Sequence, residues 1–488
     1  MWRRDKRDDG GDLPDTAREF ACGMVTRRAV TQHITDGLLP QISSKGDLPN
    51  PVRRSGSARG ETAAGRIYSS RTKSNFCCAD LVALRAAPML AGDQNALKRL
   101  DGIGRTDVMI RIFNAALAAA LLVSWPAMAH TPEQPPHQLY NEGDLKLESG
   151  EAIKDFSISY VTHGTLNAQK SNAILMVTAI SGNHHRLDFM IGPGKALDTS
   201  KYFIVCTDAI ANGLTTSPSN SKQQPRMAFP KFLIRDMVES QYRLLKEKLG
   251  IDHVVAVVGP SMGGMQTLQW GVSHPEFMDS LVAIVPLAKT PAWSVAVMEA
   301  SRKAIMNDPA WKDGNYDTPP EQGIRLWRDI VALLAARTPD MYAAQFKNGL
   351  DVLPWMEQQE TAVLKAFDAD DWIYQTWAYD RHDVGTTPGF NGDTAKALAS
   401  IKAKTLILTG TKDLLNPEFE PIEMGKNISD VTIKTISPGS ANGHASAGGF
   451  LPTDVDFLNR EVGAFLDVVA KGGKIFHYDA RAPQGRTY

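Results

Sequence analysis

The sequence predicts an α/β protein in which a mostly parallel β-sheet is covered by helices. Short apolar runs rich in β-branched residues recur without polar alternation, which is typical of strands buried on both faces. A helical stretch with one apolar stripe separates two of these runs, and strand–helix alternation favours this class. The predicted strands are 156–162, 173–179, 202–207, 254–258, 281–285, 405–408 and 431–436.

Length and composition indicate a globular enzyme. The chain has 488 residues, of which 43% are hydrophobic and 22% are charged, so it holds ample material for a large core. This length suits one large domain or two to three ordinary ones. The formal net charge of −1 gives no indication of a nucleic-acid partner.

Residues 109–129 have the three-part layout of a secretory signal peptide. A short start with one Arg precedes an apolar run over 115–125, and an Ala-Met-Ala tripeptide follows. The run is too short to span a bilayer comfortably, and a buried helix is the alternative. Because signals begin at the N-terminus, we interpret residues 1–108 as a wrongly assigned gene start or a disordered extension, with Met109 as the initiator.

The remainder divides into a core in two parts and an insertion. The first part of the core is 130–286, which begins with a short linker over 130–143, and the second part is 401–488. Within the first part, apolar residues over 234–249 form one helical stripe. Gly250 ends this helix, as glycine commonly does just past a helix C-terminus.

Residues 287–400 interrupt the strand pattern after the strand 281–285. They are predicted to form helices rich in Trp and Met, including 294–306 and 322–336, with proline-containing joints. An insertion of this size between two strands is expected to form a lid over an active site. The alternative is an ordinary helical subdomain with no role at the site.

A nucleophile motif follows the strand 254–258 directly. Residues 259–264 read Gly-Pro-Ser-Met-Gly-Gly and precede a helical run over 265–273. Glycines flank Ser261 because the chain must turn sharply from strand to helix, where a neighbouring Cβ would clash. This strand–turn–helix context predicts the α/β-hydrolase fold, with Ser261 as the nucleophile.

Asp413 and His444 complete the predicted catalytic triad. A serine hydroxyl needs a base to remove its proton, and the base needs a carboxylate to orient it. In this fold the acid and the histidine follow the serine in that order. Asp413 lies just past the strand 405–408, and His444 lies in a loop of small residues, 437–449, after the last strand.

The predicted oxyanion hole consists of two backbone amides. One belongs to Met262, directly after the nucleophile, and the other is expected from Ile180 in the loop after strand 173–179. His184 and His185 lie nearby. Without a third ligand at suitable spacing, we interpret them as a solvated loop pair rather than a metal site.

Several segments resemble homoserine O-acetyltransferases. They are 162–173, 192–202, 229–241 and 259–270, and the likeness extends over roughly 150–460. The resemblance implies an acyl-serine intermediate, a helical lid over a tunnel and often a homodimer. It also supports the same triad and the same two oxyanion residues.

The residues around the acceptor match that family less well. A lid arginine that receives the homoserine carboxylate in the family is retained as Arg328. The tyrosine seven residues later is Ala335 here, and the aspartate expected after the catalytic histidine is Ala445. Thr178 stands where that family usually has a histidine, just before the oxyanion loop. Loss of a charged partner for a buried ammonium group costs about 3–5 kcal/mol.

These features together lead us to expect an exported serine hydrolase that acts on an ester or related acyl substrate, in the periplasm or outside the cell. Acetyl-CoA is an intracellular donor, so water would resolve the acyl-enzyme there. The alternative is a cytoplasmic homoserine O-acetyltransferase that uses acetyl-CoA and tolerates Ala445. The sequence indicates no metal, no bound cofactor and no membrane span.

Overall fold

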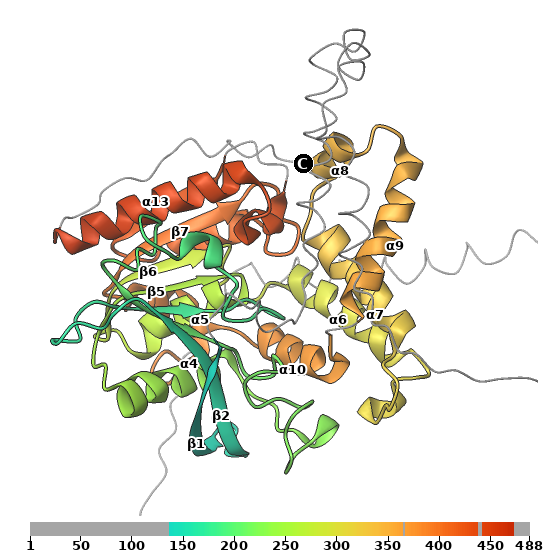
Figure 1. Ribbon diagram of the computed structural model, residues 1–488, viewed down its shortest axis with the longest axis horizontal. Coiled ribbons are helices and arrows are strands. Elements are labelled where there is room, and N and C mark those ends of the chain that lie inside the picture. The colour runs from blue at the N-terminus through green and yellow to red at the C-terminus, as the bar shows by residue number, and fades with distance from the viewer. Residues whose placement is uncertain (1–135, 365–366, 438–441, 473–488) are drawn as a thin grey trace, which may run out of the picture. The chain divides into compact units, whose positions relative to one another are not determined.

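An eight-stranded β-sheet forms the centre of the molecule. The computed structural model describes residues 136–472, except 365–366 and 438–441. The strand order is β1-β2-β4-β3-β5-β6-β7-β8. Strand β2 pairs antiparallel with β1 and β4, and the other neighbours are parallel (Figure 1). The strands are β1 (Gln138–Lys146), β2 (Ala152–His163), β3 (Ala173–Val177), β4 (Phe203–Thr207), β5 (Val254–Pro260), β6 (Met278–Ile284), β7 (Lys404–Gly410) and β8 (Val431–Ile436).

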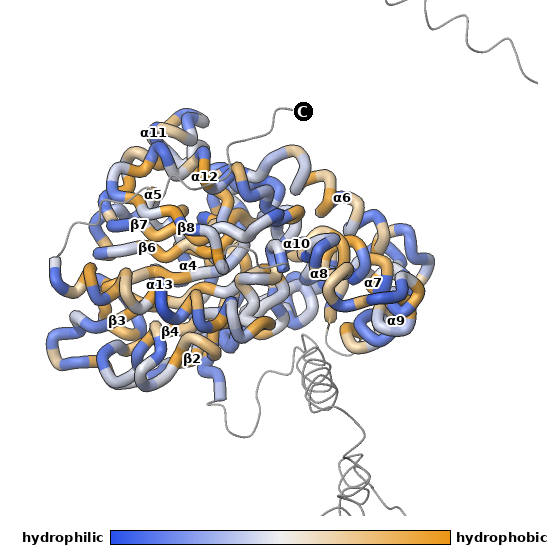
Figure 2. Tube along the Cα trace, turned by 90° about the horizontal axis from the view of Figure 1, so that it is seen from above, coloured by the Kyte–Doolittle hydropathy of each residue, from blue (hydrophilic) through white to orange (hydrophobic). Residues whose placement is uncertain are grey.

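Burial on both faces explains why the parallel strands consist of apolar runs. All five residues of β3 are buried. Leu175 and Val177 pack in one hydrophobic cluster, whereas Ile174 and Met176 pack in another on the opposite face. The predicted α/β class and its buried strands are therefore confirmed. Figure 2 shows largely apolar strands with helices of mixed hydropathy around them.

Strand β1 was not predicted, because residues 130–143 were interpreted as a linker. The linker prediction is wrong from Gln138 onward. The strand lies at the edge of the sheet, so it pairs with β2 alone, and only Glu142 and Leu145 within it are buried. An edge strand with a polar sequence lacks the continuous apolar run that identifies a central strand. Register shifts on both sides of Gly143 also interrupt the alternation of buried and exposed residues along β1.

Helices cover both faces of the sheet. α4 (Ile234–Arg243), η5 (Leu244–Leu249) and α5 (Met262–Ser273) contribute to the cluster around Leu175, and α13 (Pro452–Ala470) contributes to the cluster on the other face. The predicted helix 234–249 is present, with a π-helical second half. Gly250 ends it with a left-handed φ of 61°, as expected of a glycine C-cap.

A helical insertion separates β6 from β7. Figure 1 shows α7, α8 and α9 together on one side of the sheet. The predicted helix 322–336 is divided between an α-helical and a π-helical segment. The main helices of the insertion are α6 (Ala292–Met306), α7 (Glu321–Trp327), η7 (Arg328–Ala335), α8 (Pro339–Gln345), α9 (Val352–Val363), α10 (Ala369–Asp380) and α11 (Thr394–Ala399).

The N-terminal interpretations concern residues outside the described part of the chain. Both the extension 1–108 and the signal peptide 109–129 lie there. Among the helices of residues 136–472 that the structure describes, none combines the length and the apolar character needed to cross a membrane.

Candidate active site

Ser261 occupies a tight turn between β5 and α5. Its φ of 56° and ψ of −119° are unusual for a residue with a side chain, and its N–H donates to Ile284 O on the neighbouring strand at 2.8 Å. A Cβ on Gly259 would lie 2.5 Å from the backbone of Gly263, and a Cβ on Gly263 would lie 2.5 Å from Val177 O. The glycines are therefore required because β3, β5 and α5 meet at this turn.

His444 joins Ser261 to Asp413. Its Nε2 lies 2.8 Å from Ser261 Oγ, and its Nδ1 lies 2.7 Å from Asp413 Oδ2. The other oxygen of Asp413 accepts hydrogen bonds from the backbone N–H groups of Leu415 and Asn416, both at 2.8 Å. All three predicted triad side chains are thus brought into one buried hydrogen-bonded chain.

The segment that carries His444 includes a short helix, where the sequence analysis expected a loop of small residues over 437–449. Its described part contains η10 (Gly443–Gly448), and His444 is only 8% exposed. The insertion holds this segment from the other side, because Ala445 N–H donates to Ala336 O at 2.9 Å. Burial and this contact with the insertion favour one ring orientation.

The loop after β3 packs against the N-terminus of α5. Gln266 Nε2 on α5 donates to Thr178 O at 3.1 Å, and Ile180 is buried two residues further along the loop. Met262 is the first residue of α5. The first N–H groups of a helix have no partner within the helix and carry a partial positive charge. Met262 therefore lies directly after Ser261, and Ile180 lies on the loop that packs against the same helix.

Comparison with known proteins agrees with this geometry. A family model described as the alpha/beta hydrolase fold matches residues 172–445. A homoserine O-acetyltransferase from Methanosalsum zhilinae is 35% identical over 361 residues, which cover 67% of this chain and 71% of that protein.

The chain belongs to the homoserine O-acetyltransferase family of α/β hydrolases.

Solved structures with this fold include both transferases and esterases. The acetyl esterase MekB is 30% identical with a TM-score of 0.64, and the match covers 68% of this chain and 97% of that protein. A homoserine O-acetyltransferase from Bacillus anthracis is 27% identical with a TM-score of 0.60, over 68% and 97% of the two chains. Acyl transfer and hydrolysis therefore both occur among proteins similar to this one.

Arg328 lies buried at the start of η7, within the insertion. Its Nη2 donates to Gln359 Oε1 at 3.1 Å. Burial, together with the nearby positive charge of Arg337, lowers the pKa of the Arg328 guanidinium to about 10. The guanidinium still carries its charge at neutral pH. Ala335, where the resemblance expects a tyrosine, is buried at the end of the same segment.

His184 and His185 are not the solvated pair that was predicted. His184 is fully buried, and its backbone N–H and ring Nδ1 both bind the carboxylate of Asp208, at 2.9 and 2.6 Å. Asp208 follows β4 and lies 24 positions after His184, so no local sequence pattern indicated this pair. Within the described residues, no group of three or more His, Cys, Asp or Glu side chains could hold a metal ion.

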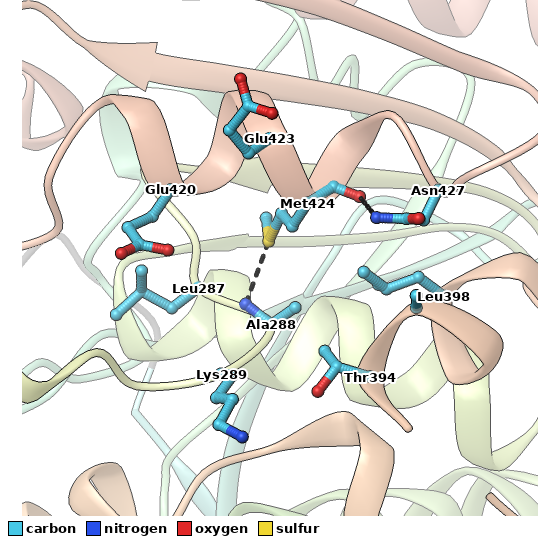
Figure 3. A pocket seen from close by; sticks show the side chains of 10 residues that line it. Leu287, Ala288, Lys289, Thr394, Leu398, Glu420, Glu423, Met424 and Asn427 are labelled. Atoms are coloured by element: carbon cyan, nitrogen blue, oxygen red, sulfur yellow. Dashed lines mark hydrogen bonds between the residues drawn. The ribbon is translucent and has the colours of Figure 1, made fainter. Parts of the chain in front are cut away.

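A cavity of about 310 Å³ lies beside α11 and α12 (Phe419–Gly425), where the chain leaves β6 (Figure 3). Leu398 and Met424 form part of its apolar lining, and Met424 Sδ accepts a hydrogen bond from Ala288 N–H at 3.0 Å. Neither Ser261 nor His444 lines this cavity. It is therefore separate from the hydrogen-bonded chain described above.

Two polar residues near the site were missed by sequence reasoning. The backbone N–H of Asn416 donates a hydrogen bond to Asp413 Oδ1, and its side-chain Nδ2 donates to Val285 O at 2.7 Å. Gln375 on α10 accepts a hydrogen bond from Ser181 N–H at 2.9 Å. Asn416 could have been suspected from its place three residues after Asp413, but Gln375 has no sequence signal.

We predict that Gly263→Ala destabilises the protein. The new Cβ would meet two backbone oxygens, Val177 O at 2.5 Å and Thr178 O at 3.0 Å, and neither can move without shifting β3. The free energy of unfolding should fall by about 1–3 kcal/mol, as in other overpacked sites. Urea denaturation measures this change.

Gly349→Ala is the matched control, because a Cβ at Gly349 meets no atom within 4 Å. Its effect should stay within about 0.5 kcal/mol. Equal stability of the two variants would contradict the close packing of the turn.

Proposed function

We propose that this chain transfers an acetyl group through an acetyl-Ser261 intermediate, as a homoserine O-acetyltransferase. The observation that carries the proposal is the His444 ring, which reaches Ser261 Oγ with one nitrogen and Asp413 with the other. A serine hydroxyl is a weak nucleophile until such a base removes its proton. Family membership supports the same chemistry.

In the first half-reaction, Ser261 Oγ attacks the thioester carbonyl of acetyl-CoA while His444 Nε2 takes the hydroxyl proton. Asp413 holds Nδ1–H and stabilises the imidazolium. The backbone N–H groups of Met262 and Ile180 bind the negatively charged oxygen of the tetrahedral intermediate, and each such donor contributes about 10²- to 10³-fold to the rate. The C–S bond then breaks, and CoA leaves as a thiol with the proton from His444.

In the second half-reaction, the homoserine hydroxyl attacks the acetyl-Ser261 carbonyl. His444 takes the hydroxyl proton and returns it to Ser261 Oγ as the ester forms. The buried guanidinium of Arg328 supports an acceptor with a carboxylate, because a planar guanidinium binds a carboxylate through two parallel hydrogen bonds. The products are CoA and O-acetylhomoserine.

Acetyl-ester hydrolysis is the second candidate, in which water replaces homoserine. Ala445 directly after His444 favours it, because an alanine cannot pair with the ammonium group of homoserine. The similarity to the acetyl esterase MekB also favours it. The names of the curated relatives agree better with the transferase, which was the alternative in the sequence analysis, than with the exported hydrolase expected there.

Export of the chain is part of the second candidate. If residues 109–129 act as a signal peptide, the enzyme would work where acetyl-CoA is absent. The N-terminal residue of protein recovered from cells should then lie near His130. A cytoplasmic chain that begins at Met1 would contradict export and remove this argument for hydrolysis.

The acceptor can be identified with purified protein that is given acetyl-CoA, with and without homoserine, while free thiol is measured. We expect CoA release that depends on homoserine. Arg328→Met should raise KM for homoserine by on the order of 10²-fold or more, because it removes one member of a buried ion pair worth about 3–5 kcal/mol.

Arg325→Met is the control for this experiment. Arg325 lies one turn earlier on the insertion, is partly exposed, and pairs with Glu360 at 3.5 Å. It should leave KM for homoserine within about twofold, since exposed ion pairs contribute little. Cleavage of p-nitrophenyl acetate without any homoserine-dependent CoA release would refute the transferase and support the hydrolase.

A further inference from the structure

Gln375 connects the insertion to the loop after β3. It lies on α10 and is 1% exposed. Its Oε1 accepts a hydrogen bond from Ser181 N–H at 2.9 Å, and its Nε2 donates to Ile210 O at 3.0 Å. One side chain therefore accepts a hydrogen bond from the backbone of one core loop and donates a hydrogen bond to the buried backbone of another.

Ser181 directly follows Ile180, whose N–H is the proposed oxyanion donor. The backbone here is strained, because Ser181 has a φ of 53°. On one side, Gly182 N–H donates to Ala179 O at 3.0 Å and closes the turn around Ile180. On the other side, Ser181 N–H is held by Gln375. The direction of the Ile180 N–H thus depends on a turn whose outer contact comes from α10.

The core holds the same loop through Asp208. Its carboxylate accepts hydrogen bonds from the backbone and ring of His184, from Ser159 Oγ at 2.6 Å and from Asn212 Nδ2 at 2.9 Å. Asn212 also donates to Gly182 O at 3.1 Å. The far end of the loop is therefore fixed by the core, whereas Gln375 is the contact at Ser181.

The same helix also contacts the loop that carries Asp413. Tyr379 lies four residues after Gln375, and residues four apart share one face of a helix. The Tyr379 hydroxyl donates to Asn416 Oδ1, and Asn416 N–H donates to Asp413 Oδ1 at 2.8 Å. One face of α10 therefore contacts both loops that flank Ser261.

We propose that Gln375 is a positioning residue that holds the Ile180 amide in the oxyanion hole. This inference rests on the proposed acyl-serine chemistry and deepens it. Without the Gln375 carboxamide, Ser181 N–H has to find another acceptor, and the strained turn can relax. The Ile180 N–H would then no longer point at the tetrahedral oxygen, although substrate binding in the ground state would be little changed.

Gln375→Met tests this inference, because methionine keeps the length of the side chain and removes both hydrogen bonds. We expect kcat for p-nitrophenyl acetate to fall about 10- to 100-fold, somewhat less than for complete loss of one oxyanion donor, with KM nearly constant. Gln375→Glu keeps an oxygen acceptor for Ser181 N–H and should retain more activity than the methionine variant.

Gln269→Met is the matched control. Gln269 is fully buried, and its Nε2 donates to Ser273 Oγ and Thr387 Oγ1, both at 2.9 Å, at the far end of α5. The same substitution there removes a comparable number of hydrogen bonds. It should lower stability as Gln375→Met does, with little effect on kcat.

A second measurement is independent of turnover. Phenylboronic acid forms a tetrahedral adduct with a serine Oγ, and one of its oxygens occupies the oxyanion hole. Its Kd, measured by calorimetry, should rise in Gln375→Met by the same factor by which kcat falls. Equal Kd and kcat values for Gln375→Met and Gln269→Met would overturn the positioning role alone. Absence of both boronate binding and ester cleavage in the wild-type protein would refute the proposed function, and the inference with it.

Discussion

The hydrogen-bonded chain from Asp413 through His444 to Ser261 is the interaction on which the rest of the structure depends. It needs a serine held in a strained turn, a ring fixed by two partners, and a carboxylate whose second oxygen is already satisfied by backbone N–H groups. Each requirement is met by a different element. A small displacement of any one of these elements would separate atoms that now lie 2.7–2.8 Å apart.

The parallel sheet explains how these elements meet. Ser261 follows β5, Asp413 follows β7 and His444 follows β8, so all three lie beyond the carboxyl ends of parallel strands. Such ends lie along one edge of a sheet, where α/β proteins bind their ligands. The insertion follows β6 and contacts segments at this edge. Its contacts at Ala445 and Ser181 show that it packs on the segments around Ser261.

Sequence reasoning succeeded where burial or chain geometry restricts the residue type. Strands buried on both faces require apolar runs, and the turn at Ser261 requires glycines, so both were predictable. It failed for polar features whose partners lie far away in the sequence. The edge strand β1 has few apolar residues, His184 is buried against Asp208, and Gln375 meets Ser181 across 194 positions. Local sequence patterns do not indicate pairings between residues that lie so far apart in the chain.

The most direct test of the central claim is to trap the acyl-enzyme. The protein would be mixed with p-nitrophenyl acetate, quenched in acid within milliseconds to seconds, and digested for peptide mass mapping. The account predicts an added acetyl group on Ser261, and none on that peptide in Ser261→Ala. Acetylation of another residue, or full turnover by Ser261→Ala, would contradict it.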